Sequence, residues 1–358
     1  MSALAAAAWP AEDHSATRLL HVDPARSAFH DALVSDLTTL LRPHDLLVLN
    51  DAATLPGSLL GWSPRGPLEL RLAGPPSGSD PSLWPAVLFG AGSWRERTEE
   101  RRRPPRLAAG DPIRLETPGA GAGLAAEVVS VSALSPRLVE LRFDREGAEF
   151  WAALFRVGRP VQYSYLRQPL PLWHVQTAFA GRPLAAEMPS AGRPLRIPLL
   201  RALRRRGVAV ATVTHAAGLS STGDPALDAA LPFPELSLVP PVAVAAVERA
   251  RGAFGRVVAV GTTVVRALEG AWRDGALRAR AATTDLRIGK GFEPRVVSGL
   301  LTGLHEPGES HFELLQAFAP RELLEAALAH AADAGYRGHE FGDASLVLAS
   351  GARGAPQA

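Results

Sequence analysis

The chain of 358 residues contains no cysteine, a single lysine at position 290 and no long apolar run. The absence of cysteine excludes disulfides, thiolate nucleophiles and cysteine-ligated zinc or iron–sulfur sites, and it favours a cytoplasmic protein. No run reaches the roughly 18 apolar residues of a membrane span, so we expect no membrane partner. Because nearly all of the basic charge is arginine, its abundance alone does not indicate phosphate recognition.

The standard nucleotide and metal motifs are also missing. No GxGxxG follows a predicted strand, no GxxxxGK[ST] loop is present, and no HExxH spacing indicates a catalytic metal, so we expect none. The content of 47% hydrophobic and 21% charged residues is that of a globular protein. At about 150 residues per domain, the length predicts two domains and leaves the oligomeric state open.

The first part of the chain indicates a β-α-β unit. Residues 18–50 begin with a short strand-like piece and end in the apolar strand 46–50. Between them, apolar residues recur at helical spacing from Phe29 to Leu41, which predicts a helix there.

A change in the pattern of predicted secondary structure at residue 65 indicates the domain organisation. Residues 65–150 hold short β-prone runs separated by Gly, Pro and Ser, and end in a helical segment that begins at Gly147. From residue 199 onward, helices alternate with strands, which is typical of an α/β core. We therefore predict a small all-β insertion over 65–150. The α/β core comprises residues 1–64 and 151–358.

A strand-to-helix junction is the most informative local pattern. Residues 257–260 suit a strand buried on both faces, and a helix-favouring segment follows. Gly261 allows close backbone approach, and Thr262 or Thr263 can cap the helix. Free N–H groups, a hydroxyl and the guanidinium of Arg266 would hold a carboxylate or phosphate. The alternative is an ordinary capped helix after a core strand.

Polar residues follow other predicted strands. Asn50 and Asp51 follow one strand, Thr214 and His215 end another, and residues 187–192 form a turn region. Because strand ends at one sheet edge meet at one crevice, we expect these groups to form a ligand site. The alternatives are a turn or helix cap at Asn50 and Asp51, and a satisfied histidine at position 215.

Two arginine-rich runs stand out against a formal net charge of only +2. Residues 93–106 carry six arginines with three glutamates, and residues 193–206 carry six arginines with no acid. Either run is a candidate RNA-binding surface or simply a solvated face.

In their order along nearly the whole chain, these segments resemble the S-adenosylmethionine:tRNA ribosyltransferase-isomerase family of queuosine biosynthesis. That resemblance implies a mixed-sheet α/β core with a small β-barrel inserted near the first third. The segments that carry it are LLVLND (46–51), VQTAFA (175–180), PSAG (189–192), RVVAVGTTVVRALE (256–269), TTDL (283–286), GLLTGLHEP (299–307), Tyr336-Arg337 and Gly342-Asp343-Ala344.

The resemblance also implies a reaction. The ribosyl group of S-adenosylmethionine, used as a co-substrate, moves to 7-aminomethyl-7-deazaguanine at the wobble position of the tRNA anticodon stem-loop. The products are epoxyqueuosine-tRNA, adenine and methionine. No metal or redox cofactor is needed, because the sulfonium already acidifies the ribose 5′ protons.

Roles follow for the residues at matching positions. His215 or Glu235 is the base or proton shuttle, and Asp51 completes the catalytic set. The arginines of one predicted helix, Arg201, Arg204, Arg205 and Arg206, contact tRNA phosphates. The predicted substrate-binding residues are Asn50, Glu187, Pro189, Ser190, Ala191, Gly192, Gly261, Thr262, Thr263, Arg266, Asp285 and His305.

The chain departs from the family pattern at places that carry chemistry. Ala52-Ala53 stands where the family has Thr-Arg, and residues 193–195 (RPL) stand where it has Leu-His-Phe. The family's Met-His is missing before Glu235, and Gly289-Lys290-Gly291 replaces Tyr-Pro-Gly. Removing polar recognition groups changes specificity strongly. Two functions therefore stay open: the family reaction, or a paralogue that binds S-adenosylmethionine or RNA and acts on another substrate or has no turnover.

Overall fold

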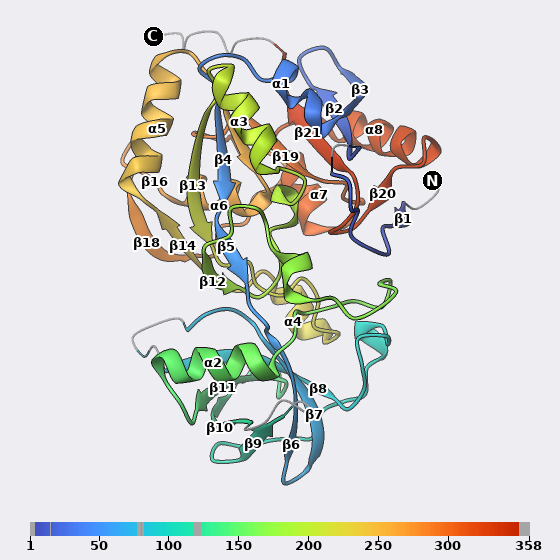
Figure 1. Cartoon of the computed structure of the whole chain (residues 1–358), viewed down its shortest axis with the longest axis vertical. Helices are drawn as coiled ribbons and strands as arrows, with labels where there is room; N and C mark the ends of the chain where they lie inside the picture. The colour runs from blue at the N-terminus through green and yellow to red at the C-terminus, as the bar shows by residue number, and fades with distance from the viewer. Residues whose placement is uncertain (1–3, 15, 77–79, 81, 117–122, 351–358) are drawn as a thin grey trace.

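The computed structural model describes residues 4–14, 16–76, 80, 82–116 and 123–350. It has two parts, a nine-stranded mixed sheet covered by helices and a closed six-stranded antiparallel barrel, which lies below the sheet in Figure 1. The predicted fold class, a mixed α/β core with a small barrel inserted, is confirmed. Within the described residues, no helix is long and apolar enough to cross a membrane.

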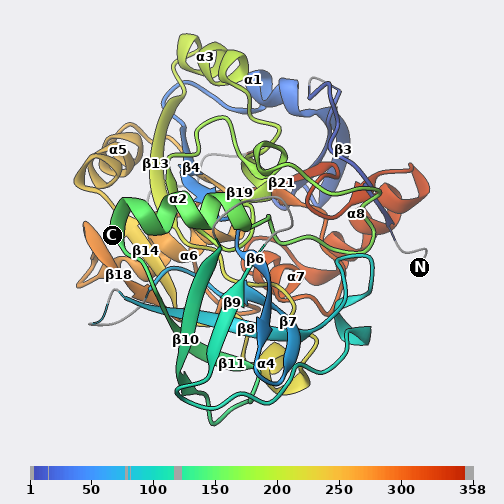
Figure 2. The ribbon, with the colours of Figure 1, turned by 60° about the horizontal axis from the view of Figure 1, so that its bottom comes forward.

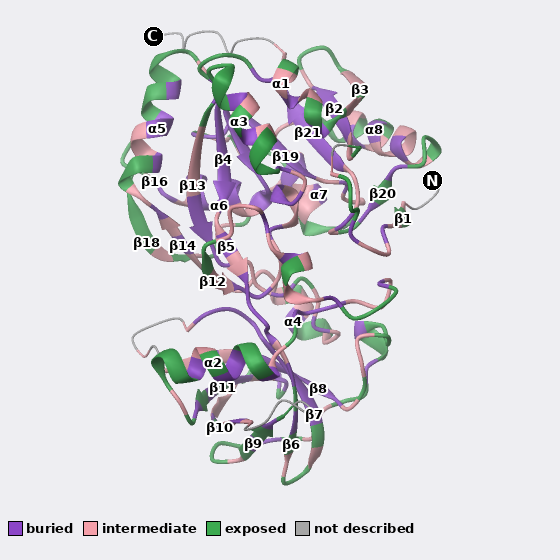
Figure 3. Ribbon diagram, viewed as in Figure 1, coloured by how far each residue is buried: buried purple, intermediate pink, exposed green. Residues whose placement is uncertain are grey.

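The large sheet has the strand order β18-β14-β13-β4-β15-β19-β21-β2-β3. Strands β13, β4, β15 and β19 are parallel neighbours, and antiparallel strands flank them on both sides. The buried centre of the sheet is purple in Figure 3. The bounds are β2 (Arg18–Asp23), β3 (Ala28–Leu33), β4 (Leu46–Asn50), β13 (Ala209–His215), β14 (Glu235–Val239), β15 (Val257–Val260), β18 (Arg280–Thr284), β19 (Gly299–Gly303) and β21 (Ala344–Leu348).

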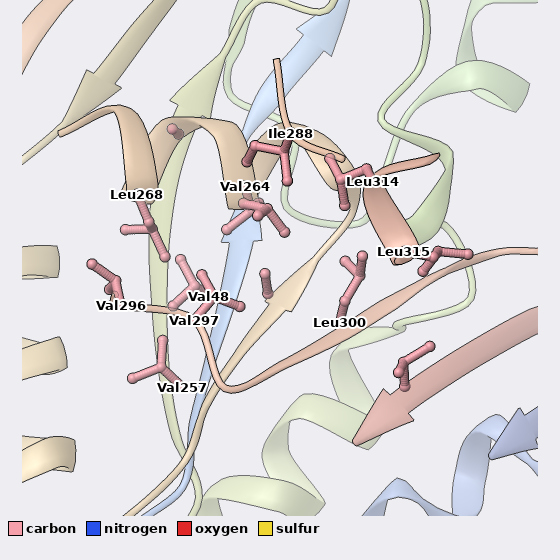
Figure 4. Close-up of a cluster of buried hydrophobic side chains, with 14 of the residues drawn as sticks. Val48, Val257, Val264, Leu268, Ile288, Val296, Val297, Leu300, Leu314 and Leu315 are labelled. Carbon is pink, nitrogen blue, oxygen red and sulfur yellow. The ribbon is translucent and has the colours of Figure 1, made fainter. Parts of the chain in front are cut away.

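Helices cover both faces of this sheet, which explains why its central strands are apolar on both sides. Val48 and Val257 pack against Val264 and Leu268 of α6 on one face (Figure 4). Leu47 and its alternating neighbours pack on the other face. The first face carries α5 (Pro241–Gly252), α6 (Thr262–Gly270), α7 (Ser310–Leu315) and α8 (Arg321–Asp333); the second carries α1 (Leu37–Leu40) and α3 (Ile197–Arg205).

The barrel has its own apolar core, in which Trp84, Phe143 and Phe150 meet at ring-centroid distances of 4.9–6.2 Å. Helix α2 (Gly147–Val157) packs on this core, and Figure 2 brings both forward. The first barrel strand begins at Ser58, ahead of the expected boundary at 65. The predicted bounds of the domains stay a prediction. The barrel strands are β6 (Ser58–Ser63), β7 (Gly66–Leu72), β8 (Leu83–Gly90), β9 (Pro112–Leu115), β10 (Leu124–Val131) and β11 (Leu138–Phe143).

The helix predicted from Phe29 to Leu41 is wrong in its first half. Residues 28–33 form β3, which pairs with β2 over six residue positions after a turn in which Ser27 has φ 49°. Only Val34–Asp36 (η1, a 3-10 turn) and α1 are helical. The pairing with β2 satisfies the backbone groups on one side of β3, which is the last strand of the sheet. Tertiary context therefore outweighs the helical periodicity of this short segment.

Short elements complete the chain. They are β1 (Ala5–Ala6), β5 (Ala52–Thr54), β12 (Arg182–Ala185), β16 (Trp272–Arg273), β17 (Ala276–Leu277), β20 (Arg337–Gly338), α4 (Pro225–Ala230), η2 (Thr98–Glu100), η3 (Leu172–Val175) and η4 (Ser190–Gly192).

Candidate active site

The ends of several core strands meet at the sheet edge that faces the barrel (Figure 1). Strands β4 and β13 end at Asn50 and His215, and β15 ends just before Gly261. Strand β14 runs antiparallel to β13, so it begins with Glu235 at the same edge. The topology therefore brings together the polar residues predicted to share one crevice.

Asn50 holds two neighbouring strand ends in place. Its amide nitrogen donates to the His215 carbonyl at 2.9 Å and to the Thr263 hydroxyl at 3.1 Å. Its oxygen accepts from the backbone N–H of His215 at 2.9 Å and of Ala52 at 3.1 Å. The amide is 2% exposed and uses its full hydrogen-bonding capacity within the protein. This geometry favours a positioning role over the predicted substrate contact.

Glu235 is the centre of the buried polar network. Its Oε2 lies 2.7 Å from His215 Nε2 and also accepts from Arg266 Nη1. Its Oε1 accepts from the Gly218 N–H at 2.7 Å. Burial would raise the pKa of Glu235, but the hydrogen bond and charge of His215 and the charge of Arg266 outweigh it and lower that pKa to about 2. Glu235 is therefore an ionised carboxylate that only accepts hydrogen bonds.

The ionisation of Glu235 fixes the proton on its neighbour. Since the carboxylate cannot donate, His215 Nε2 must carry a hydrogen, and Nδ1 is an acceptor whenever the ring is in its neutral form. His215 Nδ1 is buried and has no hydrogen-bond partner among the described residues, and the same holds for Arg266 Nη2. Because buried polar groups are usually paired, we take these two atoms, which lie on one network where the strands end, as candidate ligand contacts.

Asp51 lies at the same strand end and is half-buried. Its carboxylate accepts a hydrogen bond from the Thr214 hydroxyl, and its carbonyl accepts from Gly181 N–H at 2.8 Å. Its second carboxylate oxygen has no partner among the described residues.

The cap of the helix at the strand-to-helix junction differs from the predicted one. Gly261, with φ +91°, is the N-cap of α6, and neither threonine caps the helix. Glycine is needed here because L-residues avoid this backbone conformation. The Thr263 hydroxyl instead accepts from Asn50, and Thr262 is buried at the first helical position.

The predicted turn at residues 189–192 packs directly on this junction. Ser190–Gly192 form η4, and the Pro189 carbonyl accepts from Gly192 N–H at 3.1 Å. A Cβ placed on Gly261 would lie 3.5 Å from Ala191 Cβ, and one on Gly192 would lie 2.7 Å from Phe179. Two of the predicted binding segments are thus in contact.

Glu187 lies in a second polar cluster, joined to the first by one loop. Its Oε1 accepts from the Tyr163 hydroxyl and from the Ser220 N–H at 2.9 Å. Burial raises the pKa of Glu187, and the hydrogen bonds from Tyr163 and Ser220 oppose this shift. The loop therefore donates to Glu235 through Gly218 and to Glu187 through Ser220.

A histidine pair borders the network. His305 Nε2 lies 2.9 Å from the Thr302 hydroxyl, and its ring centroid lies 4.7 Å from that of His311. Burial and the nearby charges of His305 and Arg266 lower the pKa of His311 to about 4, although Glu309 and Glu235 oppose this. His311 was not predicted; the only signal is a second histidine six residues after the first.

Asp285 is placed less closely than the other predicted residues. It follows β18, whose Thr284 pairs with Glu235, but its side chain is exposed. It makes no side-chain hydrogen bond that involves another described residue.

The two arginine runs differ in structure. In 93–106, Arg101 is buried and contacts Glu69 at 2.7 Å. In 193–206, Arg201, Arg204, Arg205 and Arg206 are all exposed, and none of them forms an ion pair with a described residue.

A cavity lies on the other face of the sheet from His215. It has a volume of about 290 Å³ and lies beneath α3. The cavity is lined by Leu49, Phe179, Ile197, Leu200, Arg201, Arg204, Val210 and Thr212.

Within the described ranges, no group of three or more His, Asp or Glu side chains is arranged to hold a metal ion.

Comparisons with known proteins agree over almost the whole chain. The family model described as queuosine biosynthesis protein matches residues 2–347. The chain belongs to this family. Proteins named S-adenosylmethionine:tRNA ribosyltransferase-isomerase from Acidiphilium cryptum (strain JF-5) and Anaeromyxobacter dehalogenans (strain 2CP-C) are 35% and 36% identical to it. The alignments cover 95% of this chain in both cases, and 95% and 94% of the relatives.

A solved structure shares the fold. The crystal structure of S-adenosylmethionine tRNA ribosyltransferase from Thermotoga maritima matches with a TM-score of 0.53 and 22% identity, covering 97% of this chain and 99% of that one. The predicted family membership is confirmed, and with it the prediction that the protein is an enzyme.

Proposed function

We propose that the protein transfers the ribosyl group of S-adenosylmethionine to 7-aminomethyl-7-deazaguanine at the wobble position of the tRNA anticodon stem-loop. The products are epoxyqueuosine-tRNA, adenine and methionine. Membership of the family and the names of its relatives support this function. The absence of cysteine supports a cytoplasmic location.

The single observation that carries the mechanism is the pairing of His215 with Glu235. One imidazole nitrogen is held by an ionised carboxylate, and the other is buried without a protein partner among the described residues, so it is a proton acceptor when the ring is neutral. This is the arrangement by which a carboxylate orients a histidine base in the catalytic triad. We therefore assign the base to His215 and an orienting role to Glu235, because a carboxyl with a pKa of about 2 is a weak base.

The reaction then needs no electron donor. His215 Nδ1 removes a 5′ proton that the adjacent sulfonium has acidified, which leaves an ylide. The ylide electrons open the ribose at the C4′–O4′ bond, and adenine departs from C1′ with its bonding electrons and takes up a proton. The aminomethyl nitrogen of the deazaguanine attacks C4′ and loses a proton, and C5′ then bonds to C1′ to close the five-membered carbon ring. The oxygen on C1′ displaces the sulfur from C5′, which forms the epoxide and releases methionine.

The neighbouring residues bind the substrates. Arg266 Nη2 is the free donor for a ligand oxygen, since Nη1 is engaged by Glu235. Asp51, with one free carboxylate oxygen, suits a sugar hydroxyl or the aminomethyl cation. Glu187 and the Ser190–Gly192 turn border the site, and His305 lies on its far side next to His311.

A direct assay tests this function. The protein is incubated with S-adenosylmethionine and tRNA that carries the 7-aminomethyl base. We expect adenine and methionine to be released in equal amounts, and only when the modified tRNA is present. Tight binding of S-adenosylmethionine with no adenine release from any tRNA would instead support the paralogue with another substrate.

A further inference from the structure

Buried arginines in this protein almost all have an acidic neighbour. Glu69 pairs with two of them, and Asp45 and Glu235 pair with one each. Burial lowers the pKa of Arg137, and the charges of Asp224 and Asp228 oppose this shift. Arg193 is the exception among the described residues. The buried arginines are Arg71, Arg101, Arg137, Arg193, Arg256 and Arg266.

Arg193 is 8% exposed, yet no carboxylate of a described residue compensates its charge. Its Nε donates to the His174 carbonyl at 3.3 Å, and its guanidinium carbon lies 5.0 Å from the centroid of the Phe341 ring. Its Nη atoms donate to no described residue. Burial lowers the pKa of Arg193 to about 10, and the charge of Arg196 acts in the same direction. A buried cation without a counter-ion costs stability unless an anion binds there.

The groups around Arg193 are mostly cationic or neutral. His174 Nδ1 is buried and has no partner among the described residues. Burial, together with the charges of Arg193 and Arg196, lowers the pKa of His14 to about 4, and Asp13 is the acid that opposes this. The neighbourhood therefore carries an excess of positive charge.

The start of α3 adds to this excess. Arg196 is the exposed N-cap of the nine-residue helix, and no side chain of a described residue caps the N–H groups of Ile197 and Leu199, between which Pro198 has none. Helix N-termini favour anions because their N–H groups and dipole point outward. Arg201 and Arg204 continue the positive surface along the helix.

We propose that Arg193, Arg196 and the N-terminal end of α3 bind a backbone phosphate of the tRNA. This inference rests on the proposed function. A phosphate satisfies the buried guanidinium through charge-assisted hydrogen bonds. A tRNA phosphate fits better than the single carboxylate of S-adenosylmethionine, because the positive surface extends along α3 beyond one anion.

The test compares three variants with the wild-type protein. Arg193→Met removes the charge but keeps an unbranched side chain, and Arg193→Lys keeps the charge without the planar fork. Arg249→Met, at an exposed position of α5, is the matched control. For each protein, tRNA affinity is measured from low to high salt, S-adenosylmethionine affinity is measured alone, and thermal unfolding is followed with and without inorganic phosphate.

We expect Arg193→Met to weaken tRNA binding roughly ten- to hundredfold. Its salt slope should flatten by about one. Its melting temperature without ligand should be equal to or above that of the wild type, since a buried unpaired charge is gone, and phosphate should stabilise it less. Arg193→Lys should recover part of the affinity, and Arg249→Met should match the wild type.

Two outcomes would overturn the inference. One is an unchanged tRNA affinity in Arg193→Met, whether or not the variant is destabilised. The other is a loss of S-adenosylmethionine affinity with tRNA binding intact, which would assign the site to a carboxylate. Failure of the proposed function gives a different result: the wild-type protein then releases no adenine from any tRNA, while a tRNA affinity and a phosphate-dependent stabilisation that Arg193→Met lacks still support the phosphate site.

Discussion

Two buried carboxylates, one in the barrel and one at the sheet edge, each lie between two basic side chains. Glu69 contacts Arg71 Nε at 2.8 Å and Arg101 Nη1 at 2.7 Å. Glu235 contacts His215 and Arg266 in the same manner. The pKa of each carboxyl is lowered because its basic neighbours outweigh the effect of burial.

The two clusters differ in the kind of basic side chain that pairs with the carboxylate. Around Glu69, both partners are guanidinium groups that stay charged, and they lie 4.3 and 5.6 Å from the centroid of the Phe89 ring, which covers them. Around Glu235, one partner is an imidazole at the end of a strand, and its second ring nitrogen has no partner among the described residues. The same charge pattern therefore stabilises the barrel in one place and orients a proton acceptor in the other.

Replacing the sheet-edge carboxylate should have the largest catalytic effect. Glu235→Gln removes the charge that orients His215 and neutralises Arg266, so kcat/KM for adenine release should fall roughly 10²- to 10⁴-fold. Steady-state kinetics at a temperature where the variant is folded give the measurement. A variant with wild-type kcat/KM would remove the distinction between the two clusters.

The equivalent change in the barrel should act on stability. Glu69→Gln leaves two buried guanidinium groups without a counter-charge, and the free energy of unfolding should fall by about 3–5 kcal/mol. Below its unfolding transition, the variant should keep kcat within a few-fold of the wild type. Urea unfolding and the adenine assay measure the two effects, and a large loss of kcat in the folded variant would assign catalysis to the barrel cluster too.

The pH dependence of stability separates Glu235 from its surroundings. The folded-state pKa of about 2 lies below the ordinary value of 4.5, so the stabilisation from Glu235 is fully present above pH 4.5. It is lost as the pH falls from there towards 2. Glu235→Gln should therefore lose less of its unfolding free energy than the wild type over this interval. Equal losses in urea titrations would show that the carboxylate is not held as described.

A third carboxyl group, that of Glu340, provides a contrast because no basic group among the described residues offsets the effect of burial on its pKa. Burial raises the pKa of Glu340 from 4.5 to about 7. The contribution of Glu340 to the free energy of unfolding is therefore fully present below pH 4.5 and is lost as the pH rises through 7. The pH dependence has the opposite sign to that of Glu235. Glu340→Gln should be more stable than the wild type at pH 8 and show a flatter profile between pH 4.5 and 7. A steeper profile would contradict this sign.

The smallest effect is expected at the exposed end of α3. Replacing Arg204, Arg205 and Arg206 together with Ala should weaken tRNA binding evenly across sequences and lower the salt slope by about 0.7–0.9 for each phosphate that the variant no longer neutralises. Stability should change little, since all three side chains are exposed. An unchanged salt slope would limit the RNA-binding surface to other parts of the chain.

Much of the fold was predictable because its signals are local. The apolar strands at 46–50 and 257–260 and the alternation of helices with strands from residue 199 onward follow from hydrophobic pattern and propensity. Strand β3 did not, because its conformation depends on pairing with β2 rather than on its own periodicity.

The site was predictable in location but not in detail. Polar residues at strand ends indicated the correct edge, yet the sequence could not show that Asn50 has no free hydrogen-bonding group, or that Arg266 is paired with Glu235. Those facts depend on interactions between residues far apart in the chain. For the same reason His311, and the lack of a counter-ion at Arg193 among the described residues, emerge only from the structure.

Single-turnover adenine release by His215→Gln tests the central claim most directly. The substitution removes the acceptor nitrogen assigned to the 5′ proton, and saturating S-adenosylmethionine and modified tRNA separate chemistry from binding. We predict that both ligands bind within a few-fold of wild-type affinity, while the rate of adenine release falls roughly 10²- to 10⁴-fold. A wild-type rate of release would contradict the account, because the proton would then leave through another group.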